Sequence, residues 1–334
     1  MEDFERSGAG KDEFEVRTDL AVEARESFPG DGGEISGVSL KEWIQKKGRI
    51  KLTEVVVMDE RGARAMGKPV GTYLTLEAVR LLGKDEDYHR EVSEELAKQL
   101  KLLIQEQELK RPDILVVGLG NRQAAPDSLG PRVVDHLNMT RHLEREYGAE
   151  FMGEKGILAV SGIVPGVMGQ TGMESAEIVK GVVDETRPDL VIAIDALAAR
   201  SVRRLGKTIQ VTDTGIHPGS GVGNNRHRLT EETLGVPVLA IGVPTVVGAA
   251  AIVHDTVETM VETLARSQST KNYGTYVGDL DSDEQYELIR ELLEPEFGAM
   301  YVTPQDIDET VEMLSFTISE AIHQVVYKGR RGQP

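Results

Sequence analysis

The chain has 334 residues, of which 40% are hydrophobic and 28% are charged, a composition typical of a globular protein with a sizeable core. Lys and Arg number 38 against 56 Asp and Glu, which gives a formal net charge of −18. With no basic block, this balance argues against non-specific binding to nucleic acid. The absence of cysteine excludes disulfides, thiol catalysis and cysteine-ligated zinc, and it fits a reducing compartment.

The N-terminal end of the chain gives no sign of export or membrane insertion. No stretch approaches the roughly 18 apolar residues that a membrane-spanning helix requires. The opening segment MEDFERSGAGKDEFEVRTDL is acidic and has no apolar core, so it is not a secretory signal. We therefore expect a soluble cytoplasmic protein. Because residues 1–36 have little to bury, we expect them to be mobile or to lie on the surface.

Hydrophobic patterns predict strands and helices along the rest of the chain. In chain order, strands are expected at 50–58 and 73–76, and an amphipathic helix at 85–107. Short apolar runs then predict strands at 114–117, 156–160, 190–194, 208–211 and 236–241. Helical patterns fall at 131–147, 173–185 and 246–265, and acidic helices at 283–293 and 303–326 close the chain.

This alternation of apolar strands and amphipathic helices predicts the fold class. Strands buried on both faces read as continuous apolar runs, and such strands belong to sheets that are covered by helices. We expect a three-layer α/β fold with a mostly parallel or mixed central sheet and helices on both faces. No repeat or clear linker interrupts the pattern, so one α/β domain is expected.

Two aspartates follow apolar runs of the predicted sheet. Asp127 lies beyond the run at 114–117, and Asp195 directly follows the run at 190–194. Ligands bind beyond the carboxyl ends of strands in open α/β sheets, so parallel strands would bring both aspartates to one edge. Two neighbouring carboxylates can share a proton: the ionised one takes a proton from water while the protonated one supports the carbonyl. Alternatively, each aspartate merely caps a helix or a turn.

Two glycine-rich segments allow other interpretations. The turn at 118–120 resembles the start of a dinucleotide fingerprint, but Gln123 stands where a further glycine is needed. A nucleotide-binding module is therefore the runner-up. Further along, Gly219, Gly221 and Gly223 alternate, which lets a backbone approach either a phosphate or an extended peptide. A tight surface turn is an equally good explanation of these three glycines.

Other catalytic classes find little support. None of the seven histidines has a spacing that specifies zinc. Ser161, Ser175 and Ser220 lack the G-x-S-x-G context of a serine hydrolase. The aromatic fraction of 4% is too small for a platform that stacks nucleic acid bases.

Seven long segments of the chain match one known protein family. They are VRTDLAVEA (16–24), GARAMGKPVGTYLTLE (62–77), VVGLGNRQAAPDSLGPRVV (116–134), VPGVMGQTGMES (164–175), VIAIDALAARS (191–201), TIQVTDTGIHPGSGVGNNR (208–226) and GVPVLAIGVPTVV (235–247). With these segments the chain resembles the germination protease family of endospore-forming bacteria. The resemblance covers nearly the whole chain, and similarity to hydrogenase-maturation proteases is more distant.

The resemblance implies an aspartic-type endopeptidase of the spore core that starts the degradation of small acid-soluble spore proteins at germination. It implies an inactive zymogen that removes its own N-terminal segment, and a homotetramer. The essential aspartates of the family match Asp127 and Asp195. The family cleaves after an acidic residue and before an apolar stretch, which predicts processing between Asp19 and Leu20. We thus expect a propeptide over 1–19 and a peptidase domain over 20–334.

Two further expectations concern the substrate and the catalyst. A mobile segment that is first acidic and then apolar can enter a groove as an added strand, and the glycines of the 218–224 loop are expected to line that groove. We expect no cofactor. A metal-assisted peptidase, in which the same two aspartates hold a cation, stays open beside the nucleotide-binding module.

Overall fold

The computed structural model describes residues 18–26, 35–45, 47–217, 227–266, 282–297 and 300–327. Its strands are β1 (Val38–Ile44), β2 (Lys51–Val57), β3 (Gly71–Glu77), β4 (Ile114–Gly118), β5 (Val160–Ile163), β6 (Leu190–Ala199), β7 (Thr208–Thr212), β8 (Val238–Gly248) and β9 (Tyr301–Val302). Its helices are α1 (Ala21–Glu26), α2 (Glu60–Met66), α3 (Glu86–Glu106), α4 (Leu129–His136), α5 (Arg141–Lys155), α6 (Met168–Thr171), α7 (Ser175–Thr186), α8 (Glu231–Leu234), α9 (Ala249–Arg266), α11 (Ser282–Phe297) and α12 (Ile307–Val326). Two short 3₁₀ turns, η1 (Ala125–Asp127) and η2 (Val202–Arg204), complete the set.

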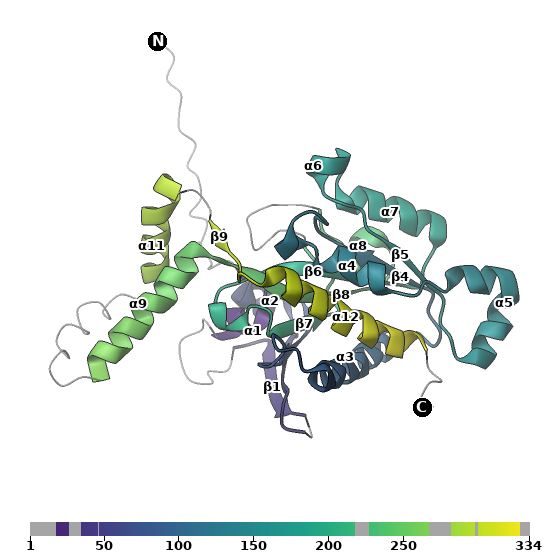
Figure 1. The fold of residues 1–334 in the computed structure, drawn as a ribbon, viewed down its shortest axis with the longest axis horizontal. Coiled ribbons are helices and arrows are strands. Elements are labelled where there is room, and N and C mark those ends of the chain that lie inside the picture. Colours follow the sequence, from purple (N-terminus) through teal and green to yellow (C-terminus); the bar gives the residue numbers. More distant parts are fainter. Residues whose placement is uncertain are drawn as a thin grey trace, which may run out of the picture.

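The strands of the described chain form one nine-stranded mixed sheet (Figure 1). Its order is β1-β2-β3-β7-β8-β6-β4-β5, and β9 adds to the end of β8. Strands β8, β6, β4 and β5 are parallel, whereas β1, β2, β3 and β7 join by antiparallel pairing. The expectation of a mostly parallel or mixed sheet is therefore confirmed in its mixed form.

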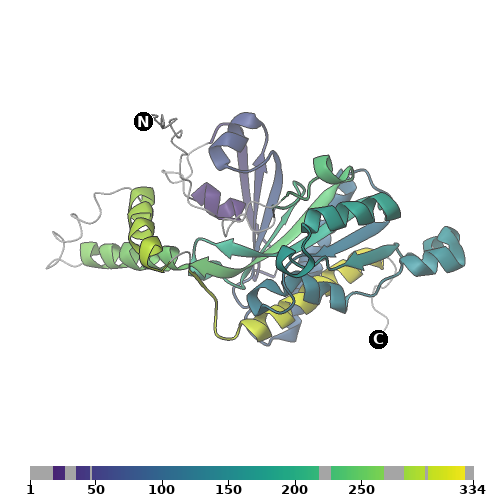
Figure 2. The same ribbon diagram turned by 90° about the horizontal axis from the view of Figure 1, so that it is seen from above.

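Helices cover both faces of the sheet, which gives three layers (Figures 1 and 2). One face packs against α3, α4 and α12, and the other packs against α1, α7, α8 and α9. Strand β4 shows why its sequence is a continuous apolar run. Ile114 and Val116 face the first cluster, while Leu115 and Val117 face the second, so every side chain of the run is buried. The predicted three-layer α/β fold is confirmed.

Several elements begin and end where local signals place them. Helix α3 follows its cap residue Asp85, whose carboxylate accepts a hydrogen bond from the Tyr88 amide.

The prediction of a single helix over 131–147 is wrong, because Leu137 is extended and the chain starts a second helix, α5. Thr140 separates the two helices, since its hydroxyl donates to the Leu158 carbonyl and accepts from the Val160 amide. These bonds tie the break to the start of β5.

The helices α9 and α11 contact each other and project from the body of the molecule (Figures 1 and 2). Their exposed apolar side chains include Val253, Met260, Leu288 and Leu292. Across the residues described, every helix falls short of the length and apolar character that crossing a bilayer requires.

Candidate active site

Asp127 sits in the turn that follows β4. Its carboxylate oxygen Oδ2 accepts a hydrogen bond of 2.8 Å from the Asn121 amide, and the side chain is half-buried. Gly120, with a φ of 112°, lies against the Asp127 backbone, where an added Cβ would come within 2.0 Å of the Asp127 carbonyl oxygen. Only glycine fits here without displacing Asp127.

Gly118, from the turn that suggested a nucleotide site, is needed for packing, as is Gly130. A Cβ on Gly118 would lie 2.3 Å from the carbonyl oxygen of Gly130, at the start of α4. A Cβ on Gly130 would in turn lie 2.5 Å from the carbonyl oxygen of Ile194. Close approach of the turn, α4 and β6 therefore explains these residues without a bound phosphate.

Asp195 lies within β6, at the same end of the sheet as Asp127. It is only 5% exposed, and its Oδ1 accepts a 2.9 Å hydrogen bond from the Ala196 amide. Strands β4 and β6 are parallel neighbours, with Gly118 beside Ile194, and the Leu119 amide donates to the Ile194 carbonyl at 2.8 Å. The turn η1, which ends at Asp127, contacts both β6 and β8. The structure thus brings the two carboxylates to one edge of the sheet rather than to opposite rims.

Residues 18–26, here called the strap, dock on the carboxyl-terminal half of β6. The Asp19 amide donates to the Ala198 carbonyl at 3.3 Å, and the Ala198 amide donates to the Asp19 carboxylate at 2.9 Å. Leu20 and Ala21 are fully buried, and Leu20 packs in the same cluster as Leu197. The predicted cleavage point Asp19–Leu20 therefore lies against the strand that carries Asp195.

Two expectations about the N-terminal region are wrong for the strap. Apolar side chains at Leu20 and Val22 bury it against the sheet, so it is not a surface segment. From Ala21 onward it forms α1 instead of adding a strand, and its strand-like pairing is limited to Asp19 with Ala198. Residues 1–17 of the predicted propeptide lie outside the described residues.

Glu23 anchors the strap and is only 3% exposed. Its carboxylate accepts from the amides of Arg200 at 2.8 Å and Ser201 at 3.0 Å, and from the Thr18 hydroxyl. The Arg204 guanidinium lies 3.5 Å away. Burial raises the pKa of the Glu23 carboxyl, and the hydrogen bonds from Arg200, Thr18 and Ser201 lower it by less.

Gln210 on β7 contacts both sides of the Asp19–Leu20 bond. Its amide nitrogen donates to the Asp19 carbonyl oxygen at 3.2 Å, and its amide oxygen accepts from the Ala21 amide at 2.7 Å. The side chain is 6% exposed. Sequence reasoning missed this residue; the available signal was a lone amide in the otherwise apolar and hydroxyl-bearing strand TIQVT.

The strand register relates Gln210 to Asp195. Asp195 pairs with Gly242 of β8, and Gly242 pairs with Gln210, so the three lie in one row across three adjacent strands. Paired residues project from the same face of a sheet. The Leu197 side chain fills the space above Gly242, where an added Cβ would lie 2.4 Å from its Cδ1. Leu197 thus occupies the middle of the row.

His217 precedes the glycine loop and lies near the strap. Burial lowers the pKa of its imidazole to about 4, assisted by the charges of Arg228 and Lys68 and opposed by Asp19. The Lys68 ammonium also contacts the strap, donating to the Thr18 carbonyl at 2.7 Å. The predicted substrate-contacting residues Gly219, Gly221 and Gly223 lie outside the described residues.

A cavity of about 520 Å³ opens beside the Asp127 turn. The Gln170 amide, on α6, donates to the Asn121 side-chain oxygen at 2.8 Å and so links this cavity to the residue that binds Asp127. Its lining comes from the turn after β4 and the segment after β5: Gly120, Arg122, Gln123, Val164, Pro165, Gly166, Gln170 and Thr171.

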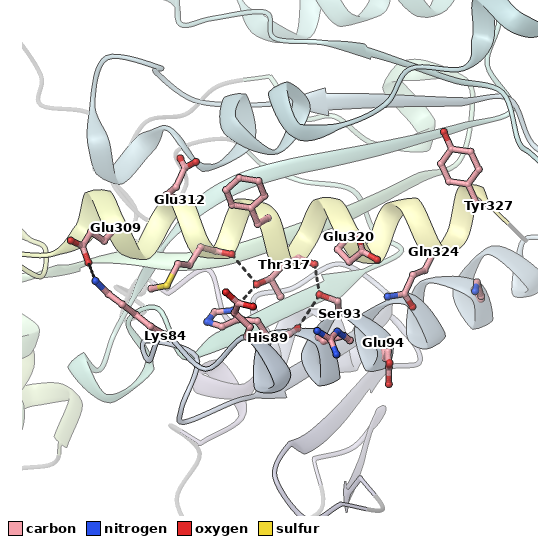
Figure 3. A pocket seen from close by; sticks show the side chains of 15 residues that line it. Lys84, His89, Ser93, Glu94, Glu309, Glu312, Thr317, Glu320, Gln324 and Tyr327 are labelled. Carbon is pink, nitrogen blue, oxygen red and sulfur yellow. Dashed lines mark hydrogen bonds and ion pairs between the residues drawn. The ribbon is translucent and has the colours of Figure 1, made fainter. Parts of the chain in front are cut away.

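A larger groove of about 1340 Å³ runs between α3 and α12, on the other side of the sheet from the strap (Figure 3). Its polar contacts are internal: the His89 ring bonds to Thr317 at 2.7 Å, and the Ser93 hydroxyl donates to the Thr317 carbonyl at 2.8 Å. Neither aspartate of the pair lines it. This groove has no place in the proposed chemistry.

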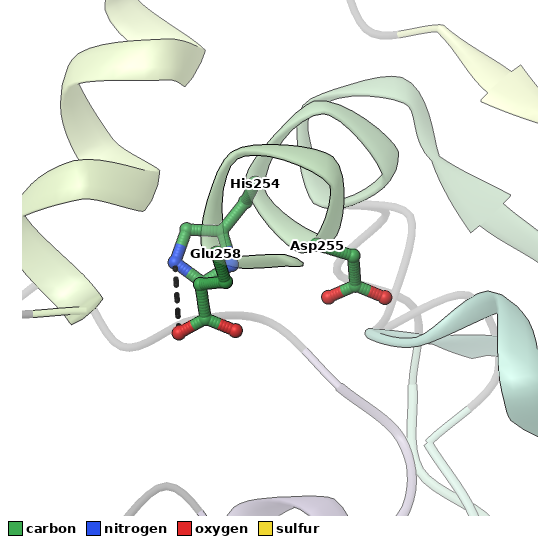
Figure 4. A group of neighbouring side chains, drawn as sticks. All are labelled: His254, Asp255 and Glu258. Atoms are coloured by element: carbon green, nitrogen blue, oxygen red, sulfur yellow. Dashed lines mark ion pairs between the residues drawn. The ribbon is translucent and has the colours of Figure 1, made fainter. Parts of the chain in front are cut away.

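One group in the described chain has the composition of a metal site (Figure 4). The ligand atoms of His254, Asp255 and Glu258 lie within 4.8 Å of one another. The Asp255 carboxylate accepts from the Ser201 hydroxyl at 3.0 Å, and the His254 ring lies 3.8 Å from Glu258. Neither Asp127 nor Asp195 belongs to this group, so it does not supply the metal-assisted mechanism considered for them.

Comparison with known proteins defines the class of this chain. A model of the germination protease family matches residues 15–276. A germination protease of Caldanaerobacter subterraneus is 48% identical over 316 residues, which cover 94% of this chain and 95% of that one. Those of Clostridium tetani and Priestia megaterium are 46% and 38% identical, with 92% and 94% of this chain covered and 94% of each relative.

The family match and these relatives define a peptidase. The chain belongs to the germination protease family, which gives it a protease role in spore germination. Among solved structures, the [NiFe] hydrogenase maturation protease HycI from Thermococcus kodakarensis is similar at 17% identity and a TM-score of 0.29, over 66% of this chain and 99% of that one.

Proposed function

We propose that this chain is an aspartic-type endopeptidase in which Asp127 and Asp195 activate water. The observation that carries the proposal is the docking of Asp19, at the Asp19–Leu20 bond, against β6, the strand that carries Asp195. One carboxylate, ionised, takes a proton from water as the oxygen attacks the peptide carbonyl. The other, protonated, gives its proton to the leaving nitrogen, so that the pair returns to sharing one proton.

The first substrate is the chain itself. Cleavage between Asp19 and Leu20 releases residues 1–19 as a propeptide and leaves a peptidase domain over 20–334. The docked strap supports this, because its acidic-then-apolar sequence is held against β6 by hydrogen bonds on both sides of the bond. Leu197 above Gly242 accounts for latency, since it fills the space between Asp195 and the strap-binding Gln210.

The processed enzyme then acts on other proteins. We propose small acid-soluble spore proteins as substrates in the spore core, and a homotetramer as the working form. The glycines Gly219, Gly221 and Gly223 line the substrate groove. A bulky substitution at Gly221 is expected to reduce cleavage of a spore protein at least tenfold. Unchanged cleavage would show that these glycines do not line the groove.

The decisive experiment compares aspartate variants with and without a chelator. Full-length Asp127→Asn and Asp195→Asn are incubated beside the wild type and Asp184→Asn, a control at an exposed position on α7. Intact mass reports the loss of residues 1–19. We expect neither active-site variant to be processed, the control to behave as wild type, and EDTA to have no effect.

Two outcomes would contradict the proposal. Processing of both asparagine variants would assign the chemistry to other residues. Loss of wild-type processing in EDTA, restored by a divalent cation, would favour the metal-assisted alternative instead.

A further inference from the structure

We infer that Gln210 is a catalytic residue of this peptidase: its side-chain amide binds the carbonyl oxygen of the bond to be cut and stabilises the negative charge that develops there. The inference rests on the proposed cleavage between Asp19 and Leu20. It adds to the aspartates, which move protons, a separate group that acts on the carbonyl oxygen.

The contacts of Gln210 define which of its atoms faces the carbonyl. The Ala21 amide can only donate, so the oxygen of the Gln210 side chain must face it, at 2.7 Å. The NH₂ group is thereby directed at the Asp19 carbonyl oxygen, at 3.2 Å. Because Gln210 holds the chain at the Asp19 carbonyl and at the Ala21 amide, the peptide bond between Asp19 and Leu20 has little freedom to rotate.

The position of the bond relative to Asp195 also fits. Asp19 bonds to Ala198 on β6 through its amide and carboxylate, and to Gln210 on β7 through its carbonyl. Because β8 lies between β6 and β7, Asp19 spans the space above β8. Asp195 and Gln210 face that space from its two sides, in the row that contains Gly242. Neighbouring strands are about 4.8 Å apart, so the Cα atoms of Asp195 and Gln210 are about 10 Å apart. The Leu197 side chain lies in this space, and it must move before a peptide group and a water can fit between the two side chains.

The chemical step balances with solvent water as the only co-reactant. The water oxygen bonds to the Asp19 carbonyl carbon, and one water proton passes to the ionised aspartate. The carbonyl π electrons move to the oxygen, whose negative charge the Gln210 NH₂ stabilises by a strengthened hydrogen bond. The C–N bond then breaks as the leaving Leu20 nitrogen takes the proton of the other aspartate. The products are a new carboxyl group on Asp19 and an amine on Leu20.

Gln210→Glu in the full-length chain separates this role from simple docking of the strap. A carboxylate still accepts from the Ala21 amide but cannot donate to the Asp19 carbonyl until it is protonated. At neutral pH we expect processing to slow by about 10²–10³-fold, the usual effect of losing one such donor. Hydrogen exchange of the Ala21 amide should change only a few-fold. As the pH falls and the introduced carboxylate protonates, the ratio of wild-type to variant rates should shrink toward one.

Gln210→Met removes both hydrogen bonds and serves as the second variant, with Gln99→Met on α3 as a control of equal burial. We expect slow processing at every pH for the first and wild-type processing for the second. Wild-type rates for Gln210→Glu at neutral pH would overturn the inference. A rate loss that merely follows loss of Ala21 protection, without pH recovery, would also overturn it by showing a docking role.

These failures are distinguishable from failure of the proposed function. If the aspartate variants remain unprocessed and the wild type is cut between Asp19 and Leu20, the peptidase proposal stands whatever Gln210 does. If the cut falls elsewhere, or proceeds without the aspartates, the proposed function fails first.

Discussion

Replacement of Glu23 by alanine should release the strap from β6. The substitution leaves the Arg200 and Ser201 amides, now bonded at 2.8 and 3.0 Å, without their acceptor in a buried site. Each unsatisfied buried donor costs about 1–3 kcal/mol, and the nearby Arg204 loses a counter-charge. We expect docking to weaken by about 3 kcal/mol, which is roughly a 100-fold increase in local opening.

Hydrogen exchange followed by mass spectrometry measures this opening directly. The reporters are the Ala21 amide, which donates to Gln210, and the Ala24 amide, which donates to the Leu20 carbonyl. Glu26→Ala is the matched control. Glu26 lies on the same helix and pairs with Arg204 at 2.6 Å, but its side chain is 59% exposed. Such a pair contributes at most about 1 kcal/mol, so exchange should rise by less than about fivefold.

The pH dependence of docking provides a second check. Burial raises the Glu23 pKa above its ordinary value of 4.5 in the docked state. A raised pKa means that the docked strap binds the proton more tightly than the free strap. The stabilisation of docking that comes from this tighter proton binding is therefore fully present below pH 4.5 and is lost as the pH rises through the raised pKa. Glu23→Ala should lack the trend. Equal exchange rates in Glu23→Ala and wild type, or equal effects of Glu23→Ala and Glu26→Ala, would refute Glu23 as the anchor.

Two further predictions concern the sheet beneath the strap. Gly242→Ala should lower the free energy of unfolding by about 1–3 kcal/mol, because the added Cβ would meet Leu197 at 2.4 Å. Urea titration should show a smaller cost of this substitution in a Leu197→Ala background, and additive costs of the two substitutions would contradict the contact. Burial raises the pKa of Tyr73 to about 12, so the stability it contributes is present below pH 10 and lost as the pH rises from 10 to 12. Tyr73→Phe should weaken this alkaline loss, whereas Tyr147→Phe, at an exposed position, should not.

Much of the sheet could be predicted because its strands are buried on both sides. Strands β4, β6 and β8 are apolar at nearly every position, and each overlaps a predicted run, although β6 and β8 continue past the predicted ends to Ala199 and Gly248. The predicted run at 156–160 instead precedes β5, which begins at Val160 after Thr140 has bonded to the chain. Strand β1 was missed since most of its side chains are exposed, which leaves no apolar pattern to detect.

The rule for parallel strands predicted that Asp127 and Asp195 lie at one edge of the sheet. No pattern in the sequence predicted that the strap docks against β6. Its burial depends on partners far along the chain, such as Arg200, which lies 177 residues from Glu23. An acidic helix of this kind looks like a surface segment until those amides and Arg204 are in place. The antiparallel direction of β7 is likewise set by its pairing with β3 and β8, and it is this pairing that brings Gln210 under the strap.

The most direct test of the aspartate mechanism is the N-terminus of the full-length chain after incubation, read by intact mass and sequencing. The mechanism predicts that the wild type begins at Leu20 and that Asp127→Asn and Asp195→Asn both still begin at Met1. A new N-terminus at any other residue, or at Leu20 in both asparagine variants, would contradict it.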